Sequence, residues 1–230
     1  GADGTDADAR VRTTLDLNRQ VGDRSAARLS LLYQDGGVPG REHAEAEAVG
    51  IAPSVAFGLG TATRVSVSAQ YLKQSGRPDW GVPGALIRGT INYHAPAAAA
   101  GRDNFYGLAS DFDDNDSVSA LVRIEHEFGN GFTLGNVSRW SETERKALYT
   151  VPSAYNAPSM MVTGQTQAYR RENDGIANLT NISGTFDTGS LGHTLSAGLE
   201  LSREGSDALR YGTTNTPLTP VLDPDFRRVV

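Results

Sequence analysis

The stretch VGIAPSVAFGLGTATRVSVSAQY, residues 49–71, decides the fold of this chain. In its second half apolar and polar residues alternate strictly, and the apolar positions are Val65, Val67, Ala69 and Tyr71. A period of two is that of a β-strand whose two faces meet different surroundings. Residues 58–61 predict a tight turn, so the stretch predicts an antiparallel hairpin. Its weak point is Pro53, because proline cannot donate a hydrogen bond to the strand ladder.

The same alternation recurs along the chain and predicts about eight strands in a single domain, residues 1–230. The expected strands span residues 10–20, 25–34, 48–57, 63–73, 117–128, 132–142, 175–187 and 192–204. Short turns near Gly22, Gly58, Gly129 and Gly189 separate the two strands of each hairpin. Long polar stretches, predicted as irregular at about 35–48, 73–116 and 142–174, separate one hairpin from the next.

This alternation of short and long connections predicts an all-β fold, an antiparallel transmembrane β-barrel segment. Such barrels have short turns on the periplasmic side, long extracellular loops and strands of about 9–11 residues across the membrane. The aromatic residues fit two membrane-interface girdles. Phe57, Phe128, Phe132 and Phe186 lie beside the short turns, and Tyr33 and Tyr71 lie toward the long loops. A soluble β-sandwich has the same period, but it is not expected to gather its long loops at one end.

Composition excludes several classes of protein. No apolar run approaches the roughly 18–20 residues of a membrane-spanning helix, whereas a mean hydropathy of -0.37 is compatible with alternating barrel strands. The chain has no cysteine, which excludes disulfide frameworks and thiolate metal sites. A net charge of -6 and a pI near 5.2 argue against a nucleic-acid partner, which would require a basic face.

Several motifs, in this order and spacing, resemble those of TonB-dependent siderophore receptors, most closely the branch associated with catecholate siderophores. Residues 50–61, GIAPSVAFGLGT, resemble the periplasmic-turn hairpin of that family. Residues 77–83, RPDWGVP, resemble the motif that opens a large extracellular loop, with Trp80 in place of the more usual tyrosine. Further matches are NFYG at 104–107, TLGNVSRW at 133–140, NLTNISGTF at 178–186, GHTL at 192–195 and GLE at 198–200.

The resemblance implies a receptor and transporter in the outer membrane of a Gram-negative bacterium, and no enzyme. Its ligand would be an iron(III)–siderophore complex, captured by extracellular loops and a plug domain and taken up with energy from the TonB complex. Its other partner would be outer-membrane lipid, with no nucleic acid and no resident cofactor. The plug, the TonB box and the C-terminal strands of such receptors have no counterpart here. Eight strands cannot close a barrel of roughly 22, so we expect a partial barrel.

A ferric catecholate is anionic and aromatic, so its pocket should offer arginine for charge and aromatic rings for stacking. The candidate ligand-binding residues in the long loops are Arg77, Trp80, Arg88, Tyr93, Arg102, Phe105, Tyr106 and Tyr155, and Tyr149 and Tyr169 are further candidates. For any one of these residues, packing within the loops or a solvated surface position is the more frequent explanation.

No pattern predicts a catalytic or metal site. Asp111, Asp113 and Asn115 have the first spacings of a calcium-binding loop, but the glycine and the final glutamate of that motif are missing. The four histidines are scattered without the spacing of metal ligands. Two alternatives stay open: a TonB-independent porin or autotransporter barrel, and a soluble all-β binding module.

Overall fold

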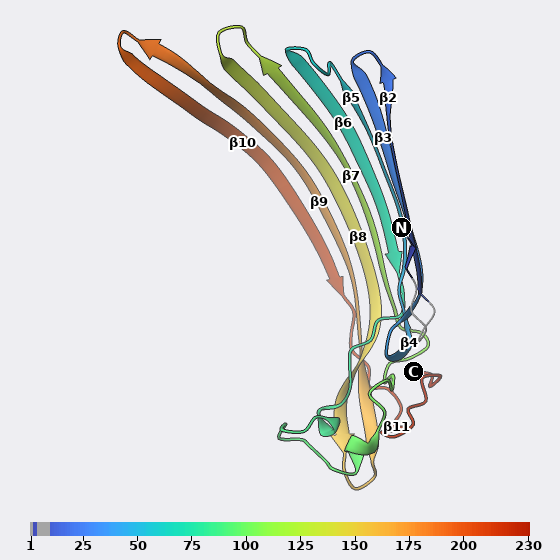
Figure 1. Ribbon diagram of the computed structural model, residues 1–230. Coiled ribbons are helices and arrows are strands. Elements are labelled where there is room, and N and C mark those ends of the chain that lie inside the picture. Colours follow the sequence, from blue (N-terminus) through green and yellow to red (C-terminus); the bar gives the residue numbers. More distant parts are fainter. Residues whose placement is uncertain (1, 4–9) are drawn as a thin grey trace.

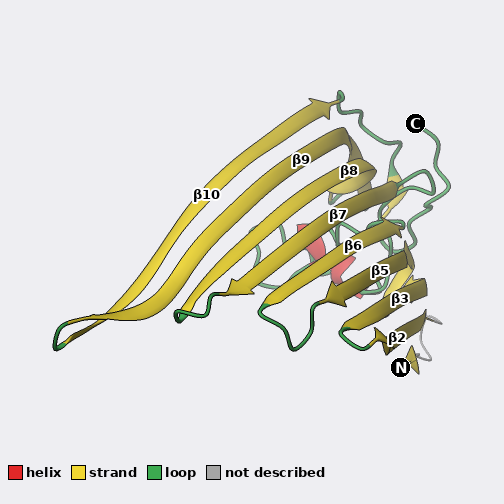
Figure 2. Ribbon diagram, turned by 90° about the horizontal axis from the view of Figure 1, so that it is seen from above, coloured by secondary structure: helices red, strands yellow, loops and turns green. Residues whose placement is uncertain are grey.

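The computed structural model describes residues 2–3 and 10–230, which form one antiparallel sheet (Figure 1). The sheet order is β1-β2-β3-β5-β6-β7-β8-β9-β10, so nearly every strand pairs with its neighbours in the chain. Figure 2 shows that these strands form a single curved wall. The elements are β1 (Ala2–Asp3), β2 (Arg10–Gly22), β3 (Ser25–Val38), β4 (Arg41–Glu45), β5 (Glu47–Phe57), β6 (Thr63–Ser75), η1 (Gly84–Leu86), η2 (Ala97–Ala99), β7 (Phe112–Glu127), β8 (Phe132–Asn156), β9 (Met161–Thr188), β10 (Leu191–Arg210) and β11 (Thr219–Pro220).

The eight long strands confirm the predicted hairpins. β5 and β6 form the hairpin of residues 49–71, and their ladder is interrupted at Ala52 and Pro53. Proline has no N–H to donate, which explains the interruption. At the other end of the wall, residues 76–111 contain only the short helices η1 and η2, as the lack of alternation there predicts. Within the described part of the chain, no helix is long and apolar enough to cross a membrane.

Two of the stretches predicted as irregular are strands instead. Residues 35–48 continue β3 and add β4, because Pro39 and Gly40 form a two-residue turn in which Gly40 has a φ of 71°. Residues 142–174 belong to β8 and β9, which run on to a short turn at 157–160 and project beyond the other strands (Figure 1). This extension was not predicted from the sequence because prolines are usual signals of a loop. Pro152 sits at a shift in the β8–β9 register, where its missing N–H does little harm.

The two faces of the wall differ in chemistry because paired residues of neighbouring strands point to the same side. One row across five strands contains only apolar residues and tyrosine: Leu15, Leu31, Ile51, Tyr71 and Val118. Most large side chains on this apolar face are exposed, with Leu199 and Leu201 at 61% and 63%. An apolar surface of this extent requires a cover, and a membrane provides one.

Four polar residues interrupt the apolar face and bond to one another. Asn136 and Ser138 of β8 lie opposite Thr180 and Asn178 of β9. Their side chains make six hydrogen bonds of 2.7–3.3 Å, which use every side-chain N–H and O–H of the group. We call this network the polar clasp. Because it satisfies all of its own donors, it can lie among apolar neighbours without a further partner.

The buried core of the described residues lies at the loop end of the wall. It contains Ala85, Ala97, Tyr106, Val162 and Val221. These residues come from the 76–111 loop, the tip of the β8–β9 hairpin and the segment that follows β10. The core therefore fixes the loops to each other and to one extended hairpin.

Candidate functional site

Residues 76–83 leave β6 and are held in place by two arginines. Arg77 donates from Nη1 to the His43 carbonyl oxygen at 2.8 Å and to Glu45 at 2.9 Å. Arg41 pairs with Asp79 through a 3.0 Å bond from Nη2, and both side chains are largely buried, at 19% and 13% exposure. Asp79 also accepts the Gly81 N–H at 2.8 Å. These bonds tie the segment to the β4 hairpin and fix the position of Trp80.

Trp80 stacks on Tyr149, with ring centroids 4.2 Å apart and planes inclined by 19°. Tyr149 contacts Tyr169 edge-on at 6.3 Å, and the Arg145 guanidinium lies 5.4 Å from the centre of the Tyr169 ring. We call these four residues the aromatic–arginine cluster. Trp80 is 47% exposed and the Arg145 side chain 43% exposed. The cluster therefore offers ring faces and a guanidinium group to a ligand in solution.

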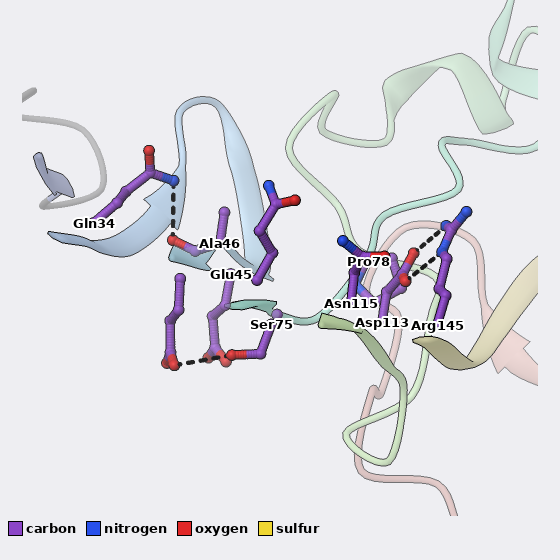
Figure 3. Close-up of a pocket in the computed structure, with 11 residues that line it drawn as sticks. Gln34, Glu45, Ala46, Ser75, Pro78, Asp113, Asn115 and Arg145 are labelled. Carbon is purple, nitrogen blue, oxygen red and sulfur yellow. Dashed lines mark hydrogen bonds and ion pairs between the residues drawn. The ribbon is translucent and has the colours of Figure 1, made fainter. Parts of the chain in front are cut away.

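The cluster continues a polar row that crosses seven strands on the polar face. Strand pairing places its residues directly opposite one another in the order Arg12, Gln34, Ala48, Gln74, Asn115, Arg145 and Arg171. Beside the row is a hollow of about 410 Å³. Figure 3 shows Gln34 at one side of this hollow and Asp113, Asn115 and Arg145 together at the other. Arg145 donates from Nε to Asp113 at 2.8 Å, so this pair is neutral as a whole.

Asp111 is a buried carboxylate that joins the 76–111 loop to β8. It accepts hydrogen bonds from the Leu108 N–H, the Thr150 N–H and the Thr150 hydroxyl, at 2.9–3.1 Å. Burial raises the pKa of Asp111, although these bonds and the charge of Arg77 oppose the shift. Nearby, the Tyr106 hydroxyl donates to the Val221 carbonyl oxygen at 2.6 Å, and burial raises the pKa of that phenol as well.

A second hollow of about 480 Å³ lies between η1 and the tip of the β8–β9 hairpin. Tyr93, His94 and Tyr155 line it, and the Tyr155 hydroxyl lies 2.6 Å from His94 Nδ1. Its lining includes no Asp, Glu, Lys or Arg. It therefore offers uncharged hydrogen-bonding groups and lacks the arginines of the first site.

The sequence-predicted site residues separate into three groups. Trp80 joins Tyr149 and Tyr169 in the exposed cluster, while Tyr93 and Tyr155 line the second hollow. Arg77, Phe105 and Tyr106 belong to the packing of the loops, the two aromatic residues at 1% exposure. The remaining two residues, Arg88 and Arg102, are exposed and lie outside these three groups.

Sequence reasoning missed Arg145, Gln74 and Asn115. Asn115 was considered only as a calcium ligand, and Arg145 lay in a stretch predicted as irregular. An alternating pattern followed past Glu142 would have placed residues 143, 145, 147 and 149 on the polar face.

The described residues contain no group of three or more His, Cys, Asp or Glu placed to hold a metal ion. Of the residues with calcium-loop spacing, Asp111 is bonded to Thr150 and Asp113 to Arg145. Both carboxylates therefore have protein partners.

Comparison with known proteins gives consistent relatives, although no family model matches the chain. The catecholate siderophore receptor Fiu of Escherichia coli K12 is 33% identical over 96% of this chain. The probable TonB-dependent receptor BfrD of Bordetella pertussis is 35% identical over 92%. The chain spans about a third of the length of these relatives, at 32% and 29%.

Solved structures agree with the sequence matches. The crystal structure of the E. coli K12 ferric-catecholate import receptor Fiu in its open form superposes with a TM-score of 0.84 over 98% of this chain and 37% of that chain, at 32% identity. The siderophore receptor PiuA of Acinetobacter baumannii superposes with a TM-score of 0.82 over 100% and 36%, at 25% identity. The wall is therefore a segment of the same barrel fold.

Proposed function

This chain belongs to the family of TonB-dependent outer-membrane siderophore receptors, over the segment that it shares with them, and we propose that it is part of a receptor for ferric siderophores. In this family the apolar face of the wall meets outer-membrane lipid and the polar face lines the lumen. The loop end, with the aromatic–arginine cluster, is then the extracellular mouth. We propose that the cluster binds the iron centre of a ferric catecholate and that the TonB complex energises uptake.

The observation that carries this proposal is the Trp80–Tyr149 stack beside Arg145. Catecholate rings bound to iron(III) present flat aromatic surfaces and net negative charge. Trp80 and Tyr149 offer flat surfaces, and a guanidinium near them attracts anions and stacks on rings. Because Asp113 neutralises Arg145, the net positive charge beside the rings comes from Arg171, which lies opposite Arg145 across the β8–β9 pair. The second hollow lacks such charge and suits an anionic complex less well.

The named relatives are receptors, which favours this function over an enzyme, a TonB-independent porin and a soluble binding module. A porin would admit solutes without a high-affinity site, and a soluble module would leave the apolar face without a lipid cover.

The experiment uses the two tryptophans of the chain, Trp80 in the loop-end cluster and Trp140 on the apolar face of β8. The full-length receptor in detergent is titrated with the iron(III) complex of a synthetic hexadentate tris-catecholate, whose visible absorption quenches nearby tryptophan. We expect saturable quenching whose amplitude is unchanged in Trp140→Phe and is reduced in Trp80→Phe by the contribution of Trp80. Trp140 is the matched control because it points from the apolar face. No saturable quenching, or equal loss in both variants, would overturn the proposal. Radioactive iron uptake in cells with and without TonB tests the energy source.

A further inference from the structure

The polar row beside the aromatic–arginine cluster carries two amide side chains with unused hydrogen-bonding groups. Within the described part of the chain, no hydrogen bond to the Gln74 side chain is found, and the Asn115 amide makes one long bond, 3.3 Å to the Ser117 hydroxyl. Gln34, in contrast, is 7% exposed and accepts bonds from Arg10 and Arg12 at 2.8 and 2.9 Å. Gln34 therefore has its hydrogen-bonding groups occupied by the protein, whereas Gln74 and Asn115 have groups that remain available to a ligand.

The carboxylates around the hollow do not add net negative charge beside the polar row. Asp113 is paired with Arg145, and Glu45 is paired with Arg77. Glu47 accepts a hydrogen bond of 3.4 Å from the Ser75 hydroxyl. Both residues lie two positions along their strands from Val49 and Lys73, so their side chains point to the apolar face, away from the row. The groups that meet a ligand beside the cluster are thus neutral amides. A primary amide provides two donors and one carbonyl acceptor, which complement another amide at two points.

We infer that Gln74 and Asn115 form a scaffold subsite, which recognises the carboxamide links of a siderophore while the aromatic–arginine cluster holds its iron centre. This inference rests on the proposed function. Gln74, Asn115 and Arg145 lie on three successive strands, and adjacent strands are about 4.7–4.9 Å apart. Carboxamides that join catechol rings to a backbone lie directly beside the iron-binding oxygens. The two subsites are therefore close enough to act on one ligand.

The test compares two synthetic iron(III) tris-catecholate complexes of equal charge. In one the catechols are joined through carboxamides, and in the other through hydrocarbon links. Binding to the full-length receptor is measured by the Trp80 quenching titration. We expect Gln74→Leu and Asn115→Ala each to weaken binding of the carboxamide complex roughly fivefold to tenfold, as for one or two lost hydrogen bonds. Binding of the hydrocarbon-linked complex should change by less than about twofold.

Gln70→Leu is the matched control. Gln70 is on the same strand and the same face, four residues closer to the short turns, and it makes no contact with this hollow. It should alter neither complex. Equal weakening of both complexes by Gln74→Leu, or no change with either variant, would overturn the scaffold subsite. If neither complex binds the unaltered receptor, the proposed function itself fails, which is a different result.

Discussion

The polar clasp should show strong energetic coupling if the apolar face lies in lipid. The perturbation is a double-mutant cycle of Asn136→Ala and Asn178→Ala. These two amides share two hydrogen bonds, of 3.2 and 3.3 Å, and each also bonds Ser138 or Thr180. Polar pairs inside a membrane contribute about 0.6 kcal/mol on average and up to about 1.7 kcal/mol. Two shared bonds therefore predict a coupling energy of about 1–3 kcal/mol.

The coupling energy is measured by urea titration of the full-length receptor in lipid vesicles, following tryptophan fluorescence. The cycle is preferable to single variants because the transfer of each alanine into lipid cancels from the coupling term. The control cycle uses Ser117 and Thr143, whose hydroxyls lie 3.3 Å apart on the polar face. Water competes for those hydroxyls, so their coupling should be close to zero. A coupling below about 0.5 kcal/mol for the clasp, which is the usual scatter of independent sites, would refute its placement in lipid.

Three further predictions concern the loop end. Asp111→Asn should abolish the pH dependence of the stability of the contact between Asp111 and Thr150. Burial raises the pKa of Asp111. The stability that Asp111 contributes is therefore present below its unfolded pKa of about 4 and is lost as pH rises through the folded pKa. Hydrogen exchange at the Thr150 amide, corrected for intrinsic rates, measures it, and an unchanged slope in the variant would contradict this. Gly164→Val should release the segment that follows β10, because a Cβ there would lie 2.9 Å from the Thr216 hydroxyl oxygen of that segment and 2.6 Å from Thr150 Cγ2 on β8. We expect faster protease cleavage within 211–228, with Gly212→Val, where an added Cβ meets open space, as the control. Arg145→Ala should weaken ferric tris-catecholate binding roughly tenfold and reduce its salt dependence, as expected for about 1.4 kcal/mol from one partly exposed cation.

The sequence contains most of the information on the wall but less on its loop end. The alternation of Val65, Val67 and Ala69 is a local property, so the hairpin of β5 and β6 could be predicted. The extension of β8 and β9 could not, because Pro152 and Gly164 are usual loop signals. Whether a strand can contain such residues depends on their partners in space. Gly164, for example, lies against Thr150 and against Thr216, and Thr216 is more than 50 residues away in the chain.

The candidate site shows the same limit. A preference for aromatic residues and arginine in the long loops made Trp80 one of several candidates. The choice between ligand contact and loop packing, however, depends on which face each side chain takes. Phe105 and Tyr106 are as aromatic as Trp80, yet they are buried in the loop core. Arg145 became visible only through its position opposite Asn115.

The segment of residues 211–228 has a consequence for receptor engineering. It bonds to β9 through Thr166 and Gly164, to the 76–111 loop through Ala109, and stacks Phe226 on His43 at 3.7 Å. Three loops are therefore assembled on one shared connector. A chimera that received a single loop from a relative would acquire it without the surfaces that shape it. Exchange of ligand preference between two such receptors would require residues 35–48, 76–111, 156–168 and 211–228 to be transplanted together.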